Sequence, residues 1–202
     1  MNPVSTPQTM NRRNFLKSSV VTAALLNTAR AADLAPPPTG RAASGFNVEP
    51  QKDRHDAELL IMGGRVDLKV SGRDTGGDLT VYESIRVPKG GPALHRHHFQ
   101  DEWFYVIRGE FIVRVGDETF HLRPGASAFA PRKIPHAFAK ISEGEAQMLF
   151  LFQPAGSMED FFAQADKITK ENPPNQEALF NQLWASHGME VVGPPLEFQN
   201  TP

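Results

Sequence analysis

Short runs of alternating apolar and polar residues, separated by glycine and proline, fill the middle of the chain from Leu59 to Gln153. Alternation with a period of two puts every second side chain on the same face of a strand, and the turn residues end each run. Many short strands with such turns favour a sandwich or a barrel. We expect strands at residues 58–62, 65–70, 79–87, 102–108, 110–115, 118–123, 126–130, 136–142 and 146–153.

The hydrophobic period changes after Pro154. Ser157 and Asp160 form an S-x-x-D capping pattern, and apolar residues then recur at helical spacing. A second helix is expected from Asn175 to His187, with Gly188 as its stop. We expect the apolar faces of both helices to cover the barrel or a neighbouring subunit.

Residues 1–31 have the features of an export signal. Arg12 and Arg13 precede a modestly apolar run at 18–28, and the segment 29–31 has the small residues of a cleavage site. The paired arginines resemble a twin-arginine signal, which implies export to the periplasm or out of the cell. The apolar run is shorter than the about 20 residues that span a bilayer, so we expect no stable membrane anchor.

The remaining chain divides by composition. Residues 32–57 are polar and rich in proline and are expected to form a linker or a strap over the surface. We place the β-barrel at 58–153, and the C-terminal helices and tail at 154–202. A mature chain of about 170 residues is an ordinary length for one domain.

The charge balance excludes some partners. Without residues 1–31 the chain keeps 17 of its 21 basic residues against 23 acidic ones, a net charge of −6. No basic stripe remains, which argues against a nucleic acid partner. The chain has no cysteine, so disulfides and thiolate ligands are excluded.

Four side chains have the identity and spacing of a metal site. His95 and His97 are two residues apart, so on a strand both imidazoles point to the same side. Glu102 reaches that side from the start of the next strand, and His136 comes from a distant one. Imidazole and carboxylate ligands without a thiolate suit one divalent transition metal per chain, namely Fe, Ni, Mn, Co, Cu or Zn.

The same residues carry a family resemblance. A His-x-His pair, followed after four residues by Glu102 and after six more by Gly109, resembles the first cupin motif. Gly116, Pro124, Gly125 and His136 match parts of the second motif, in which Lys140 takes the place of the usual Asn. The resemblance covers roughly residues 79 to 153. It implies an all-β double-stranded β-helix, a jelly-roll barrel, followed here by two C-terminal α-helices, and a homodimer.

Strand alternation also predicts the surroundings of the metal. Phe104 and Val106 share the inward face of Glu102, while Phe138 and Lys140 share the face of the fourth ligand. These four side chains are the predicted substrate pocket, and its apolar character suits an aromatic or enolic molecule better than a sugar or a small diacid. We expect Lys140 to extend to solvent, because an unpaired buried ammonium is costly. The alternative is that Lys140 pairs with an anionic substrate oxygen.

The other histidines have no partner at ligand spacing. His98 points away from the site if its strand is regular, and a bulge would be needed to bring it in. We expect His55, His121 and His187 at the surface or at a helix end.

Within the cupins, the chain resembles the quercetinase-like enzymes. It implies a metal-dependent dioxygenase in which dioxygen and a substrate enolate or phenolate react at the metal. By the same resemblance Glu102 is both a ligand and the catalytic base that accepts the substrate hydroxyl proton. Two alternatives stay open: a non-catalytic cupin that binds a metal or a small ligand, and an oxalate-type oxidase or decarboxylase.

Overall fold

The computed structural model describes residues 40–197. The export signal expected at 1–31, the beginning of the proline-rich segment and residues 198–202 lie outside the described residues. The elements are β1 (Leu59–Ile61), β2 (Gly64–Val70), β3 (Thr80–Arg86), β4 (Ala93–His97), β5 (Asp101–Arg108), β6 (Phe111–Val115), β7 (Glu118–Leu122), β8 (Ser127–Ala130), β9 (His136–Lys140), β10 (Ala146–Gln153), α2 (Met158–Glu171), α3 (Gln176–Ser186) and β11 (Met189–Pro195).

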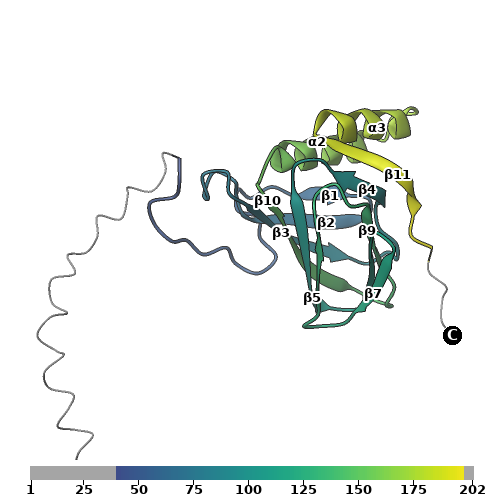
Figure 1. The fold of residues 1–202 in the computed structure, drawn as a ribbon. Helices are drawn as coiled ribbons and strands as arrows, with labels where there is room; N and C mark the ends of the chain where they lie inside the picture. Colours follow the sequence, from purple (N-terminus) through teal and green to yellow (C-terminus); the bar gives the residue numbers. More distant parts are fainter. Residues whose placement is uncertain (1–39, 198–202) are drawn as a thin grey trace, which may run out of the picture. The chain divides into compact units, whose positions relative to one another are not determined.

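Two antiparallel sheets form the body of this region (Figure 1). One has the strand order β1-β2-β3-β10-β5-β8 and the other the order β11-β4-β9-β6-β7. The strands expected between 58 and 153 are all present within two residues of their expected bounds. The expected all-β jelly-roll barrel with two C-terminal helices is therefore confirmed.

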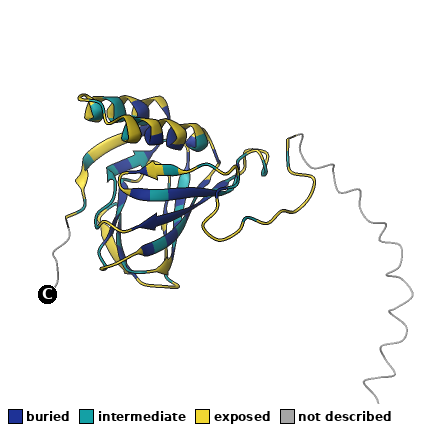
Figure 2. Cartoon of the chain, turned by 180° about the vertical axis from the view of Figure 1, so that it is seen from behind, coloured by how far each residue is buried: buried dark blue, intermediate teal, exposed yellow. Residues whose placement is uncertain are grey.

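The inward faces of both sheets form one hydrophobic core. Phe104, Phe111 and Met148 are almost completely buried, and the Tyr82 ring stacks on Phe150 with the ring centroids 5.3 Å apart. Figure 2 shows buried residues concentrated in the strands of the barrel and exposed residues along the helices and the connecting segments. The alternation in the sequence arises from this division into an inner and an outer face.

α2 and α3 lie beside each other across one end of the barrel (Figure 1). α2 buries Met158, Phe161 and Phe162 against the core. Ser157 occupies the N-cap as expected, but its side chain makes no capping hydrogen bond. Among the described residues, no helix is long and apolar enough to cross a membrane.

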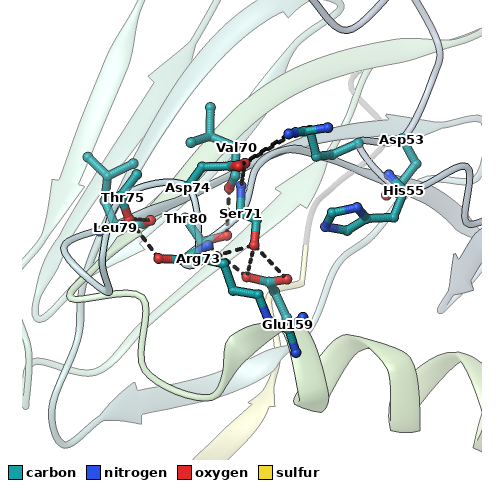
Figure 3. Close-up of polar contacts among 12 residues, drawn as sticks. Asp53, His55, Val70, Ser71, Arg73, Asp74, Thr75, Leu79, Thr80 and Glu159 are labelled. Carbon is teal, nitrogen blue, oxygen red and sulfur yellow. Dashed lines mark hydrogen bonds and ion pairs between the residues drawn. The ribbon is translucent and has the colours of Figure 1, made fainter. Parts of the chain in front are cut away.

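Polar contacts hold the start of α2 to the end of β2 (Figure 3). The Ser71 hydroxyl donates a hydrogen bond to Glu159 Oε1 at 2.9 Å, and the Gly72 N–H donates to the same oxygen at 2.7 Å. A carboxylate in the first turn of a helix is also favoured by the helix dipole. These contacts fix the helix over the barrel end.

The described part of the proline-rich segment is joined to β2 near its end, at residues 51–53. Asp53 is buried, and its carboxylate accepts hydrogen bonds from the N–H of His55 and of Leu68, each at 2.7 Å. The second bond joins the segment to β2. Residues 42–47 of the same segment are exposed.

The end of α3 lies where the sequence predicts it. Gly188 follows the helix with φ of +70°, as expected for a helix stop. His187 is the C-cap residue of α3, as expected for a histidine at a helix end, and it is buried there because its ring contacts both helices. Its Nε2 lies 3.1 Å from Asp160 Oδ2 and its Nδ1 lies 2.9 Å from the Leu183 carbonyl oxygen.

β11 was not predicted, because its sequence reads as a tail rich in glycine and proline. It pairs antiparallel with β4, placing Met189 opposite His97 and Val191 opposite His95. On its other side β4 pairs with β9 through His95 and His136 alone. β11 therefore supplies most of the backbone pairing of the strand that carries the two histidines.

Gly91, just before β4, lies against the backbone of β9. A Cβ atom added there would lie 1.8 Å from the carbonyl oxygen of Phe138. Next to it, Gly90 and Lys140 exchange two backbone hydrogen bonds, of 2.9 and 3.0 Å. Only glycine fits at this close approach of two chain segments.

Gly91→Ala is expected to lower the free energy of unfolding by about 1–3 kcal/mol, since the backbone of β9 has to move. Urea denaturation measures the difference. Gly45→Ala is the matched control, because nothing lies within 4 Å of a Cβ added at Gly45. Equal stability of the two variants would contradict the close approach.

Lys140 is buried, which corrects the expectation that it extends to solvent. Its Nζ donates hydrogen bonds to the carbonyl oxygens of Val87 and Ser142, both at 2.7 Å. These acceptors replace water at the ammonium and make burial tolerable. Burial nevertheless lowers the pKa of the Lys140 ammonium below 10.5.

This lowered pKa predicts a pH-dependent stability. Between the folded-state pKa and 10.5 the unfolded wild type binds more protons than the folded one, so wild-type stability rises with pH. Lys140→Met lacks this effect. Its unfolding free energy relative to wild type should therefore fall between pH 7 and pH 10.5.

Paired urea denaturation at several pH values checks this prediction. Lys167→Met is the control, because the Lys167 side chain is 73% exposed. A stability difference for Lys140→Met that stays constant with pH, as expected for the control, would show that the Lys140 pKa is not shifted by folding.

Candidate metal centre

The four predicted ligands converge between the two sheets. His95 and His97 lie on β4 and His136 on β9, where His95 and His136 are directly opposite each other. Glu102 reaches them from β5 in the facing sheet. One ligand atom from each residue lies within 4.8 Å of all the others, and all four residues are buried.

Backbone carbonyls orient two of the imidazoles. His95 Nδ1 lies 2.8 Å from the Ala93 carbonyl oxygen, and His136 Nδ1 lies 2.9 Å from that of Ile134. A carbonyl only accepts, so in each case Nδ1 is the protonated nitrogen and Nε2 is free to bind a metal. These contacts fix both the tautomer and the ring direction.

Glu102 lies between the rings of His97 and His136 and contacts both. Its Oε2 lies 2.9 Å from His136 Nε2 and 3.5 Å from His97 Nε2. The rings of His97 and His136 are nearly parallel, with an interplanar angle of 8°. His97 Nδ1 is buried without a hydrogen-bond partner among the described residues. Its tautomer is therefore less constrained than those of the other two histidines.

The electrostatics of the cluster favour a bound cation. Burial, together with the neighbouring imidazoles, lowers the pKa of His95 to about 3, so this ring is neutral at pH 7. Burial by itself raises the pKa of Glu102, but hydrogen bonds from His136 and His97 outweigh it and lower the pKa to about 2. Burial lowers the pKa of His136, and the Glu102 carboxylate reverses this to a net increase.

The donor set fits a divalent transition metal. Bonds of about 2.0–2.2 Å to nitrogen and oxygen put opposite ligands about 4.4 Å apart. The span of 4.8 Å between the ligand atoms here is close to that value. Three neutral imidazoles and one carboxylate are ligands that Fe, Mn, Co, Ni, Cu and Zn accept.

The other histidines lie apart from this centre. The His98 side chain is 41% exposed, and its Nε2 lies 3.7 Å from Glu190 Oε2, as expected for a regular strand. His121 pairs with Glu110 at the surface, and His55 is exposed.

A cavity adjoins the centre and is lined by three of the ligands, His95, His97 and Glu102. Aromatic and other apolar side chains from the barrel and from both helices form most of its wall. These side chains are Ile61, Met62, Val66, Pro92, Phe138, Phe150, Phe152, Met158, Phe161, Phe162, Ala165, Phe180, Trp184 and Met189. The Trp184 ring of α3 lies over His95 with a centroid distance of 4.5 Å.

The predicted pocket residues take different positions. Phe138 lines the cavity, whereas Phe104 and Val106 are buried in the core and are not among its lining residues. Lys140 is held by backbone carbonyls and is not among them either. Trp184 and Arg86 also line the cavity and were not among the predicted pocket residues. Alternation along β3 puts Arg86 on the same inward face as Tyr82, and this pattern could have identified Arg86 as an inward-facing residue.

Comparison with known proteins agrees with this fold. Residues 83–152 match the family described as "Cupin domain". An uncharacterized protein of Methanocaldococcus jannaschii is 29% identical over 75 residues, which are 37% of this chain and 60% of that protein. Polyketide synthase CurC of Streptomyces cyaneus is 33% identical over 60 residues, 30% of this chain and 39% of that protein. The matches thus span less than two thirds of either relative.

Among solved structures, KdgF from Halomonas sp. is 21% identical, with a TM-score of 0.44. The match covers 53% of this chain and 94% of that one. The two-sheet barrel of this chain is a cupin fold, and the family match identifies a cupin domain at residues 83–152.

Proposed function

We propose that this protein is a metal-dependent dioxygenase that acts on an aromatic or enolic small molecule. The observation that carries this proposal is a buried set of three histidines and one glutamate in the wall of an apolar cavity. Open coordination positions distinguish a catalytic metal site from a closed structural one.

His95, His97, Glu102 and His136 would hold the metal. A divalent transition ion bound there would supply a Lewis-acidic centre at which a substrate oxygen and dioxygen could meet. Four protein ligands leave one or two positions open on an ion that prefers five or six ligands.

The chain's own residues would bind and orient the substrate. Phe150, Phe152 and Trp184 offer ring faces next to the ligands. The helices α2 and α3 cover the cavity and exclude water, which strengthens electrostatic interactions inside it. An aromatic substrate suits this lining better than a small diacid such as oxalate.

Glu102 would accept the proton of the substrate hydroxyl. Its lowered pKa keeps it a carboxylate at neutral pH, so an Oε atom is available as the acceptor.

One relative supports the substrate class. CurC, by its name, belongs to polyketide synthesis. Polyketide chains carry enolisable carbonyl oxygens, which are metal-binding groups of the kind proposed here. Export through the twin-arginine route and a homodimeric state, both expected from the sequence, are proposals that accompany this function.

The proposed ligands predict the metal content of the purified protein. The wild type should hold about one transition metal ion per chain after purification without chelator, measured by elemental analysis. Glu102→Ala and His97→Ala should each weaken binding by about 100-fold or more, because the loss of a ligand exceeds the effect of losing a supporting hydrogen bond.

His121→Ala is the matched control, since this histidine also pairs with a glutamate but lies at the surface. Wild-type metal content in Glu102→Ala would show that Glu102 is not a ligand.

Oxygen consumption tests the proposed dioxygenase activity. Metal-loaded protein should consume one dioxygen molecule for each flavonol or enol converted, measured with an oxygen electrode and product analysis. Tight binding of these compounds without oxygen uptake would instead indicate a non-catalytic binding cupin. Turnover of oxalate in preference to them would indicate the oxalate-type alternative.

A further inference from the structure

Arg86 is a buried cation in the wall of the cavity. It lies at the end of β3 with its inward-facing neighbours Ser84 and Tyr82, and only 6% of its surface is exposed. Both Arg86 and Ser84 line the cavity that also contains His95, His97 and Glu102. The remaining lining is apolar, so Arg86 is the positive group in the wall among the described residues.

The guanidinium is only partly satisfied. One terminal nitrogen, Nη2, donates a hydrogen bond to the Met62 carbonyl oxygen at 2.8 Å. Nε is buried and has no hydrogen-bond partner among the described residues. No carboxylate of the described region forms an ion pair with Arg86, in contrast to Arg65 and Arg132, which pair with Asp67 and Asp101.

A buried guanidinium without a counter-charge is unfavourable for the protein when no ligand is bound. A buried charge normally has a counter-charge, because its transfer from water costs several kcal/mol. Five N–H donors in a planar fork match a carboxylate through two parallel hydrogen bonds. A guanidinium that lines an apolar cavity and has no counter-charge therefore has donors for an anionic ligand.

We propose that Arg86 is the binding residue for a carboxylate of the substrate. The ligand would be an apolar, aromatic carboxylic acid that pairs with Arg86 and presents a second oxygen to the metal centre. The proposal rests on the proposed function in taking the same cavity as the substrate site. It narrows the substrate from any aromatic or enolic molecule to one that also carries an anionic group.

The test compares two probes that differ only in charge, cinnamate and cinnamamide, by calorimetric titration. Wild-type protein is expected to bind cinnamate about tenfold or more tightly than the amide, since hydrogen bonds to a charged group are the stronger ones. Arg86→Met should remove this preference but still bind the amide. Arg86→Lys, which keeps the charge, should retain part of the preference.

The control is Arg123→Met, because the Arg123 side chain is 71% exposed and does not line the cavity. It should keep the wild-type preference for cinnamate. Arg86→Met is expected to fold with an unchanged or higher Tm, because removal of an uncompensated buried charge is not destabilising. Circular dichroism melts measure this independently of any ligand.

Titrations of both metal-loaded and chelator-treated protein separate this proposal from the proposed function. A preference for cinnamate that persists without metal and disappears in Arg86→Met supports Arg86 as the anion site, even if oxygen uptake is never observed. The proposal is wrong if Arg86→Met keeps the preference, or if wild-type protein binds neither probe or binds both equally. Oxygen uptake with neutral enols would leave the proposed function intact in that case.

Discussion

The burial of one carboxylate among three imidazoles is the interaction on which the site depends. Glu102 comes from one sheet and the histidines from the other, so the cluster joins the two halves of the barrel. A buried carboxylate requires partners that replace its lost water, and His136 and His97 are those partners. The same geometry presents converging donors to a cation. The close approach at Gly91 and the pairing of β11 with β4 keep the histidine strand in place.

The sequence predicted the ligands and most of the barrel for a clear physical reason. Spacing along a strand determines which side chains share a face, so His95, His97 and the strand bounds follow from local patterns. The burial of Lys140 could not be predicted, because it depends on the carbonyl oxygen of Val87, which is distant in the sequence and approaches only in the folded chain. For the same reason the pairing of β11 was missed, since its partner strand is distant in the sequence.

The cavity shows a further limit of reasoning from alternation. An inward direction does not distinguish the core from the cavity: Phe138 lines the cavity, whereas Phe104 and Val106 lie in the core. Trp184 reaches His95 from a helix that covers the barrel, a contact that no strand pattern encodes. The helices thus complete the environment of the metal centre. Arg86 adds a positive charge to a wall that is apolar apart from Ser84 and the metal ligands.

The most direct test of the account is X-ray absorption spectroscopy of the metal-loaded protein at the edge of the bound metal. The account predicts a single type of site, with three imidazole ligands visible through their outer-shell scattering and the remaining ligands oxygen, at about 2.0–2.2 Å. A coordination shell without imidazole scattering, or with one imidazole alone, would contradict the convergence of His95, His97 and His136 on one ion.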